Sequence, residues 1–390
     1  MKMVLSCRRH HYLAGLTIFL VVVALAAGMV GCGGGGGDES YALTVSTTTG
    51  GVVAVNDVII PGTALFAYDA GTVVSLNATP DTGYRFINWT GNVSTVADVN
   101  ATSTTITMNG DYSITANFAL EIWDWYDLDA IRDDLSGYYL LMNNLDSTTA
   151  GYEELASGTA NGGMGWDPIG SSDDLFTGTF DGQGYEIRDV VINRPAGGRA
   201  GLFGAVREGV VKNLGVVNAT VTGYGEVGGL VGWNEYGTVS NCYFAGSVIG
   251  NGNVGGLVGW NYYGTGNNSY STGSVTGSSW VGGLVGYNSG PVSNSYSTSS
   301  VTGEDLVGGL VGLNDDGAVT NCFWDTETSG QPTSAGGTGK TTAQMKSIAT
   351  FSSAAWSIVT VANPSTRNPS YIWNIVDDET YPFLSWQPLP

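Results

Sequence analysis

The sequence predicts an all-β fold: a right-handed parallel β-helix with helical or loop caps, preceded by a small β-rich module. Three observations predict it, namely a repeat of about 27 residues, short β-prone segments within each repeat, and a high glycine content. A fixed period in this range is typical of solenoids, in which each repeat buries its apolar face only against its neighbours. Connections between parallel strands are nearly always right-handed, which sets the expected hand.

The repeat is defined by the motif Val-Gly-Gly-Leu-Val-Gly, which begins at Val227 and recurs at Val254, Val281 and Val307. A shorter form, Ala-Gly-Leu-Phe-Gly, begins at Ala200. The central leucines of these copies are Leu202, Leu230, Leu257, Leu284 and Leu310. Because equal positions of stacked coils lie above one another, the leucines are expected in one inward column. With the less regular flanks, the chain offers about seven coils.

Each repeat contains three short segments suited to strands, separated by Gly, Asn and Ser, which favour turns. No segment is long enough for a stable helix, and glycine at this density opposes one. Asparagines also recur at fixed positions, for example at Asn241, Asn268 and Asn294. In stacked coils such residues can form amide ladders that satisfy the backbone groups of turns.

A known repeat shares this pattern. Gly-Gly-Leu-Val-Gly-x-Asn, followed by x-Val-x-Asn-Cys/Ser-Tyr and Gly-Ser-Val, closely resembles the GLUG repeat of bacterial surface proteins. The resemblance is specific over residues 201–325 and weaker on both sides. It implies a β-helical, adhesin-type molecule, and some GLUG repeats accompany surface proteases.

Residues 1–31 have the features of a lipoprotein-type signal peptide. Three basic residues precede an apolar run that ends in Met-Val-Gly-Cys, which makes Cys32 the expected lipidation site. The five glycines that follow, within residues 32–40, suit a flexible tether between a lipid anchor and a folded domain. The alternative is an uncleaved membrane anchor, because about 18 apolar residues can just span a bilayer.

Cleavage after residue 31 would leave 10 basic and 34 acidic residues, a formal net charge of −24, and no histidine. Such a charge repels nucleic acids and anionic lipids, so nucleic acid is excluded as a partner. Without histidine there is no Ser-His-Asp triad, no His-ligated zinc and no HExxH helix. We therefore expect no catalytic residue, no metal and no cofactor.

Residues 41–119 are expected to form a spacer of short alternating strands. The expected strands are 42–48, 52–55, 72–76, 84–89, 104–108 and 112–118. Asn109-Gly110-Asp111 is a hairpin signal between the last two. The glycine and aromatic pattern, which includes Tyr84, Phe86, Trp89 and Phe118, resembles the divergent InlB B-repeat. That resemblance implies a small β spacer module of a bacterial surface protein.

Residues 120–390 are expected to form the β-helix domain, whose open ends need caps. At the start, Asp124 or Asp127 can cap a helix that Gly137 ends. The apolar residues of this helix have helical spacing: Leu128, Ile131 and Leu135. At the far end, residues 326–390 are expected to form the closing cap, with an aromatic-rich tail whose rings pack.

Two sets of aromatic residues recur at fixed positions and would form columns in a stack. The first is Trp233, Trp260 and Tyr287, beside Asn234, Asn261 and Asn288; the second is Tyr243, Tyr270, Tyr296 and Phe323. We predict the first set as a ligand stripe, with flat rings for sugars or an extended partner and asparagines for hydrogen bonds. The alternative is that the rings stack on one another. Stacking is favoured for the second column, and both readings stay open for the first.

Cys242 and Cys322 occupy the same position of the repeat, three coils apart. Strand spacing puts them about 14 Å from each other. A disulfide needs Cα atoms within about 7 Å, so none is expected between them.

The predicted function is that of an adhesin-like protein, exported and lipid-anchored at the outer membrane or cell surface. Its β-helix stalk would present a binding surface to extracellular glycans or matrix proteins. The alternative is a polysaccharide-binding or polysaccharide-active accessory protein. Adjacent acids such as Glu304/Asp305 and Asp315/Asp316 leave room for a carboxylate-based enzyme, but acids at turns are usually solvated.

Overall fold

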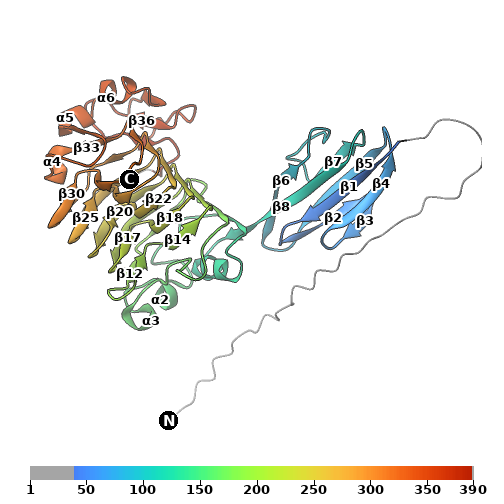
Figure 1. Cartoon of the computed structure of the whole chain (residues 1–390), viewed down its shortest axis with the longest axis horizontal. Coiled ribbons are helices and arrows are strands. Elements are labelled where there is room, and N and C mark those ends of the chain that lie inside the picture. The colour runs from blue at the N-terminus through green and yellow to red at the C-terminus, as the bar shows by residue number, and fades with distance from the viewer. Residues whose placement is uncertain (1–38, 389–390) are drawn as a thin grey trace, which may run out of the picture. The chain divides into compact units, whose positions relative to one another are not determined.

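The computed structural model describes residues 39–388 and divides the chain after Phe118 into two compact units (Figure 1). The predicted signal peptide, the lipidation site Cys32 and the glycine tether lie outside the described residues. Within residues 39–388, no helix is both long and apolar enough to cross a membrane.

The first unit is a β module with a buried apolar core. Its strands are β1 (Ser40–Thr47), β2 (Gly51–Val55), β3 (Val58–Ile60), β4 (Ala64–Asp69), β5 (Val73–Pro80), β6 (Tyr84–Gly91), β7 (Ser103–Thr107) and β8 (Tyr112–Ile122). The order β3-β2-β5-β7 is antiparallel throughout, whereas β1 pairs antiparallel with β4 and parallel with β8. Alternate residues face inward, so Val45, Val74 and Trp89 are at most 2% exposed.

The strands expected in this module are present, but the expected hairpin between β7 and β8 is wrong. β7 pairs with β5, and β8 pairs with β1. The Asn-Gly-Asp turn therefore carries the chain from one sheet to the other. Local turn chemistry favours a tight hairpin here. Instead, β7 and β8 lie in different sheets, and Ile106 of β7 and Ile114 of β8 pack into the same buried core from those two sheets.

The second unit is a parallel β-solenoid over residues 179–324, and each coil adds one strand to each face (Figure 1). The face that matters most here has the order β14-β18-β22-β26-β31, and the face beside it has the order β13-β17-β21-β25-β30. All the pairs between successive coils are parallel, which confirms the predicted β-helix. The right hand expected for the coil stays a prediction.

The strands of these coils are short. They are β10 (Thr179–Asp181), β11 (Glu186–Arg188), β12 (Val191–Asn193), β13 (Arg199–Ala200), β14 (Phe203–Arg207), β15 (Val210–Lys212), β16 (Gly215–Thr222), β17 (Glu226–Gly228), β18 (Val231–Glu235), β19 (Thr238–Ser240), β20 (Tyr243–Ile249), β21 (Val254–Gly255), β22 (Val258–Tyr262), β23 (Thr265–Asn267), β24 (Tyr270–Thr276), β25 (Ser279–Gly282), β26 (Val285–Asn288), β27 (Val292–Ser293), β28 (Tyr296–Ser297), β29 (Ser300–Thr302), β30 (Asp305–Gly308), β31 (Val311–Asn314), β32 (Val319–Thr320) and β33 (Phe323–Asp325). The described residues form about five regular coils rather than the expected seven, because the flanking segments form caps and a side layer instead.

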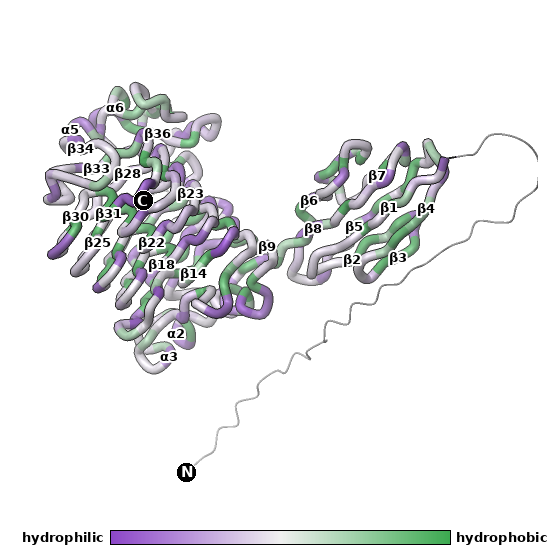
Figure 2. The backbone as a smooth tube through the Cα atoms, in the orientation of Figure 1, coloured by the Kyte–Doolittle hydropathy of each residue, from purple (hydrophilic) through white to green (hydrophobic). Residues whose placement is uncertain are grey.

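The leucine column is confirmed. Leu202, Leu230, Leu257, Leu284 and Leu310 are each at most 2% exposed. Three backbone hydrogen bonds of 2.9–3.0 Å join the last four leucines one to the next, as from the N–H of Leu257 to the carbonyl of Leu284. Apolar and polar segments alternate around each coil, as Figure 2 shows. The repeat period therefore sets which residues meet inside the solenoid.

Two columns of asparagine side chains stabilise the turns. Asn234, Asn261, Asn288 and Asn314 form a ladder in which each amide nitrogen donates to the next amide oxygen at 2.7–2.8 Å. The same nitrogens also donate to glycine carbonyls of their own turns, such as Gly264 for Asn261. A second column adopts the left-handed backbone, with φ of 48–54°: Asn213, Asn241, Asn268, Asn294 and Asn321. Asparagine tolerates that conformation better than most residues.

The N-terminal cap forms around Asp124 as expected, but its helical segment ends at Asp133, before Leu135 and the expected stop at Gly137. The Asp124 carboxylate accepts hydrogen bonds from the N–H groups of Tyr126 and Asp127 at 2.9 and 3.0 Å, and α1 (Trp125–Asp129) follows. The chain continues into the short helix η1 (Ala130–Asp133), β9 (Tyr138–Leu141), α2 (Tyr152–Leu155) and α3 (Ala160–Gly163). Leu128 and Ile131 are fully buried in the same apolar core as the leucine column, so this segment closes the core.

The C-terminal segment does more than close the end, which corrects the expected cap. β34 (Thr338–Lys340) pairs with β33, and the Ser334 hydroxyl accepts a hydrogen bond from the N–H of Val311 at 2.8 Å. The remainder is α4 (Thr326–Ser329), α5 (Thr342–Met345), α6 (Ile348–Ser352), β35 (Ile358–Thr360), β36 (Trp373–Ile375) and β37 (Phe383–Leu384). Residues 345–384 pack over the outer side of the solenoid, on the second aromatic column.

We predict that the asparagine ladder stabilises the solenoid. Replacing Asn261 with Ala leaves the amide nitrogen of Asn234 and the amide oxygen of Asn288 without their partners in a buried site. The expected loss of unfolding free energy is about 2–3 kcal/mol, measured by denaturant titration. Asn251→Ala at an exposed position is the control and should change stability little. Equal stability of both variants would contradict the ladder's role.

The two cysteines are buried and free, which confirms the expected absence of a disulfide between them. Burial raises the pKa of each thiol to about 12, so both are protonated at pH 8 and present no thiolate. We predict that an alkylating reagent at pH 8 leaves Cys242 and Cys322 unmodified in the folded chain and modifies both in guanidinium, as peptide mass mapping would show. Rapid modification of the folded chain would contradict the coil register.

Candidate ligand-binding face

Seven aromatic side chains form one connected surface on the solenoid, which we call the aromatic patch. Its members are Trp233, Tyr236, Trp260, Tyr262, Tyr263, Trp280 and Tyr287. Strands β18, β22, β25 and β26 and the turns after them supply these residues. The ring centroids of neighbours lie 4.7–6.1 Å apart along the connected path. The parallel register brings together rings from three successive coils.

The predicted column of Trp233, Trp260 and Tyr287 lies at the centre of the patch. Trp233 and Trp260 are 6.1 Å apart, and Trp260 and Tyr287 are 5.4 Å apart, with tilted rings. All three are half-buried, and the indole N–H groups of both tryptophans are enclosed without an acceptor. The Arg199 guanidinium lies over Trp233, 3.8 Å from its centroid. This column therefore stacks internally, and it supports the more exposed rings beside it.

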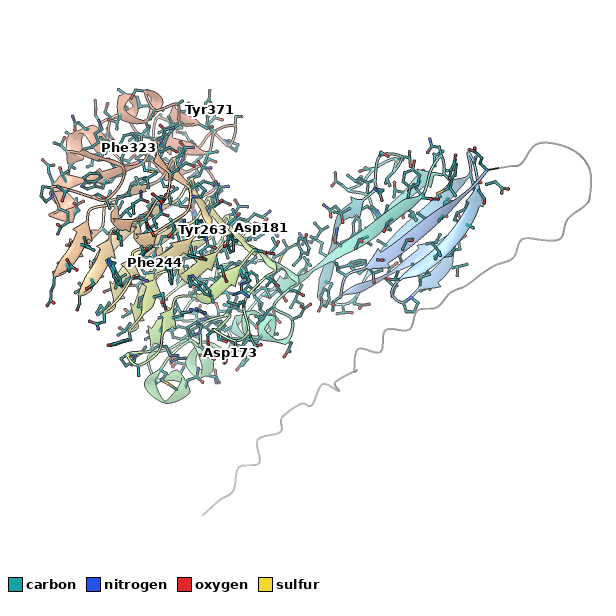
Figure 3. All side chains as sticks on the ribbon, in the orientation of Figure 1. Asp173, Asp181, Phe244, Tyr263, Phe323 and Tyr371 are labelled. Atoms are coloured by element: carbon teal, nitrogen blue, oxygen red, sulfur yellow. The ribbon has the colours of Figure 1, made fainter. Side chains whose placement is uncertain are left out.

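The most exposed rings are those of Tyr236 and Tyr263, which are 53% and 54% exposed. They stack on each other at 5.7 Å and 10°, and Figure 3 labels Tyr263 among the side chains of the solenoid. Both have a left-handed backbone, with φ of 53° and 50°. A bulky residue is strained there, and such strain clusters at functional sites. Asparagine fills the left-handed position of another turn, so folding alone does not explain these tyrosines.

The asparagines of the predicted stripe do not belong to this surface, which corrects that part of the prediction. Asn234, Asn261 and Asn288 are at most 2% exposed. Their amides bond to one another inside the coil, because along a strand successive side chains point to opposite faces. A ring that faces outward therefore places the following asparagine inside.

The second aromatic column is buried. The rings of Tyr243, Tyr270 and Tyr296 stack at 5.0 and 4.9 Å within 3° of parallel, and the C-terminal segment covers them. The hydroxyl of Tyr296 donates to the Pro382 carbonyl, and that of Tyr270 donates to Gln387. Burial raises the pKa of all three phenols. The rings of this column stack on one another, as predicted from the sequence. The C-terminal layer that covers them was not predicted.

The adjacent acids also do not form a shared site. Glu304, Asp305, Asp315 and Asp316 are all exposed. Asp315 accepts a hydrogen bond from the hydroxyl of Tyr287 at 2.9 Å. Within residues 39–388, no cluster of three or more metal-binding side chains is present.

A cleft of about 810 Å³ adjoins the aromatic patch at Arg199. Its charged lining residues are Arg132, Arg194, Arg199, Asp167, Asp174 and Glu226, and its other walls include Gly170, Ser171, Ser172, Gly197 and Gly198. A volume of this size is typical of small-molecule sites.

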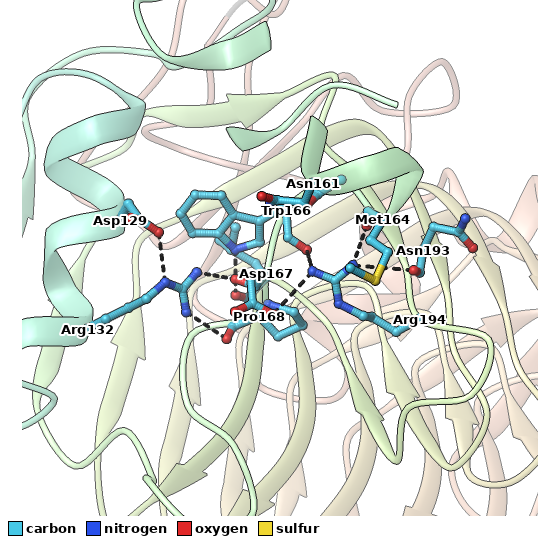
Figure 4. Close-up of polar contacts among 11 residues, drawn as sticks. Asp129, Arg132, Asn161, Met164, Trp166, Asp167, Pro168, Asn193 and Arg194 are labelled. Atoms are coloured by element: carbon cyan, nitrogen blue, oxygen red, sulfur yellow. Dashed lines mark hydrogen bonds and ion pairs between the residues drawn. The ribbon is translucent and has the colours of Figure 1, made fainter. Parts of the chain in front are cut away.

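Two of these arginines hold a loop of the cleft in place, as Figure 4 shows. Arg132 donates to the carbonyls of Asp167 and Pro168, and it forms an ion pair with Asp129. Arg194 donates to the carbonyl of Trp166 at 3.0 Å and to the carboxylate of Asp167 at 3.1 Å. Their donors are occupied by the protein itself.

Arg199 differs, because its guanidinium has no hydrogen-bond acceptor among the described residues. Its nearest carboxylate, on Glu226, is 4.0 Å from Nε, and Nη1 is enclosed without a partner. Burial lowers the pKa of this guanidinium. Stacking on Trp233 fixes the side chain, and the part of the guanidinium outside the enclosed Nη1 is left to meet a ligand.

Sequence reasoning missed this cleft and four members of the patch. Tyr236 and Tyr263 share one repeat position, just before a glycine, so their recurrence was a usable signal. Trp280 and Tyr262 have no aromatic equivalent in the neighbouring coils, and only the stacked structure brings them to the column. The cleft joins residues 132–226 through tertiary packing, which no local pattern marks.

Comparison with known proteins supports the two-part organisation. The model of the divergent InlB B-repeat domain matches residues 41–122, and that of the GLUG motif matches residues 223–249. Halomucin from Haloquadratum walsbyi is 34% identical over 139 residues, which cover 34% of this chain and 2% of halomucin. A protein from Evansella cellulosilytica, provisionally named a Gly-rich membrane protein, is 43% identical over 84 residues, which cover 20% of this chain and 10% of that protein.

One solved structure is also similar in part. It is a candidate immunoglobulin A1 protease from Bacteroides ovatus, with 20% identity, a TM-score of 0.47, and coverage of 70% of this chain and 93% of that one. Similarity at this level carries no argument about activity. The two matched family models show that the chain combines a divergent InlB B-repeat domain with a β-solenoid that carries the GLUG motif.

Proposed function

We propose that this protein is a surface-exposed binding protein whose solenoid holds glycans on the aromatic patch. The observation that carries the proposal is the pair of left-handed, half-exposed tyrosines, Tyr236 and Tyr263, which stack on each other beside rings in tilted and edge contacts. A strained backbone lowers stability, and solvent-exposed aromatic side chains lower solubility. A ligand that binds to these rings would explain why they are present. Aromatic faces with hydroxyls beside them suit the apolar faces and hydroxyls of sugar rings.

Binding without catalysis is the form of this function that the chain supports best. Residues 39–388 contain no histidine. Of the acids next to the patch, Asp315 is exposed and the part-buried Glu235 is paired with Arg207, so the two do not form a carboxylate pair suited to acid–base chemistry. The adjacent β module would act as a spacer that holds the solenoid away from its anchor.

A surface location follows from three separate considerations. The N-terminal segment is a predicted export signal, the GLUG motif and InlB B-repeat are surface-type repeats, and one relative is named as a membrane protein. The proposed partners are therefore the membrane, through a lipid on Cys32, and an extracellular glycan.

Lipid anchoring is testable at Cys32. In bacteria grown with an alkyne fatty acid, the expressed chain should become labelled and should fractionate with membranes. Cys32→Ala should abolish both, whereas Cys7→Ala, within the predicted signal peptide, should abolish neither. Labelling of the Cys32→Ala variant would contradict the proposal.

The binding role is tested by the double variant Tyr236→Asn, Tyr263→Asn. Asparagine accepts the left-handed backbone, so the unfolding free energy should stay equal or rise, whereas glycan binding should fall at least about tenfold. Binding is measured on a glycan array and then by calorimetry with the best saccharide. Tyr371→Ala, an exposed tyrosine of the C-terminal segment, is the matched control. Unchanged binding, or loss of the fold, would return these tyrosines to a structural role.

A further inference from the structure

The cleft beside Arg199 carries opposite charges in equal number. Three arginines and three carboxylates line it. The Arg132 and Arg194 guanidinium groups are committed to the loop carbonyls, and the Asp167 carboxylate is paired with Arg194. The groups left for a ligand are Arg199, Glu226 at 4.0 Å from it, and exposed Asp174. The cleft thus offers both a charged donor and charged acceptors.

This lining discriminates among ligands by charge. An anionic group would be attracted by Arg199 but repelled by Asp174 and Glu226, and a cationic group would meet the reverse. A hydroxyl both donates and accepts, so a polyol satisfies both signs at once. The hydroxyls of Ser171 and Ser172 and the backbone of Gly197 and Gly198 add further polar partners with little steric bulk.

Charge farther away also opposes an anionic ligand. The sequence after residue 31 is strongly acidic, with 34 acidic and 10 basic residues. A polyanion would be repelled on approach over roughly the Debye length, about 8 Å at physiological salt. An uncharged ligand is not repelled in this way.

The cleft and the aromatic patch meet at a single side chain. Arg199 lines the cleft and also stacks on Trp233 of the patch, so a saccharide chain lying on the rings would reach the cleft with its next units. We propose that the cleft is a second subsite of the same binding face and that it excludes anionic saccharides. This inference rests on the proposed function and adds the class of ligand and the groups that choose it.

Two variants that change the charge balance in opposite directions test the selection. Among the groups left for a ligand, Arg199→Gln leaves two carboxylates and no guanidinium, and Asp174→Asn leaves one of each; both positions are at least partly exposed and should fold. The probes are a neutral oligosaccharide chosen on the array, its uronate-bearing counterpart, and its amino-sugar counterpart. Affinities are measured by calorimetry at 0.05 and 0.5 M NaCl, together with the melting temperature of each variant.

The folded wild type should prefer the neutral probe, with little dependence on salt. Arg199→Gln should weaken the neutral probe about tenfold and shift preference toward the amino sugar. Asp174→Asn should shift preference toward the uronate. A wild type that prefers the uronate with affinity falling steeply in salt, or variants that leave the preference unchanged, would overturn the inference.

The experiments distinguish failure of this inference from failure of the proposed function. If the tyrosine double variant loses binding while both cleft variants keep the wild-type preference, the patch is the binding site and the cleft is not a subsite. If the wild type binds no saccharide on the array, the proposed function fails and the inference fails with it.

Discussion

The stacking of one coil on the next in strict register is the constraint on which the rest of the solenoid depends. Each backbone pairs with its equivalent in the next coil, so a residue type that recurs once per repeat becomes a column. Leucines fill the interior, and the amides of Asn234, Asn261, Asn288 and Asn314 join coil to coil where the turns would otherwise leave buried polar groups unpaired. The same register sets the spacing of the outward rings.

The coil register produces two sets of stacked aromatic side chains, of which one is buried and the other is exposed. The C-terminal segment packs over Tyr243, Tyr270 and Tyr296 and turns them into a second core. Nothing within residues 39–388 covers Tyr236 and Tyr263 in the same way, and they stay more than half exposed. What distinguishes a buried column from an exposed one is therefore the path of the C-terminal segment, not the identity of the rings.

Much of the fold could be predicted because a short period repeats the same local chemistry several times. The leucine column, the coil register and the separation of Cys242 from Cys322 all follow from counting. The hairpin at Asn109-Gly110-Asp111 failed, because a turn signal says nothing about which sheet the next strand joins. The prediction that Asn234, Asn261 and Asn288 contact a ligand is wrong for a related reason. Side chains alternate along a strand, so the residue after an outward-facing ring points inward.

The sequence by itself determined the solenoid, its inward leucines and the recurrence of the rings, because stacking turns periodicity along the chain directly into position in space. Only the tertiary structure decided which rings stay exposed and where a cleft opens. Trp280 joins the patch, and Arg132, Arg194 and Arg199 meet around the cleft, through contacts between residues far apart in the chain. Such contacts depend on how irregular segments fold back on the coils, and no repeat encodes that path.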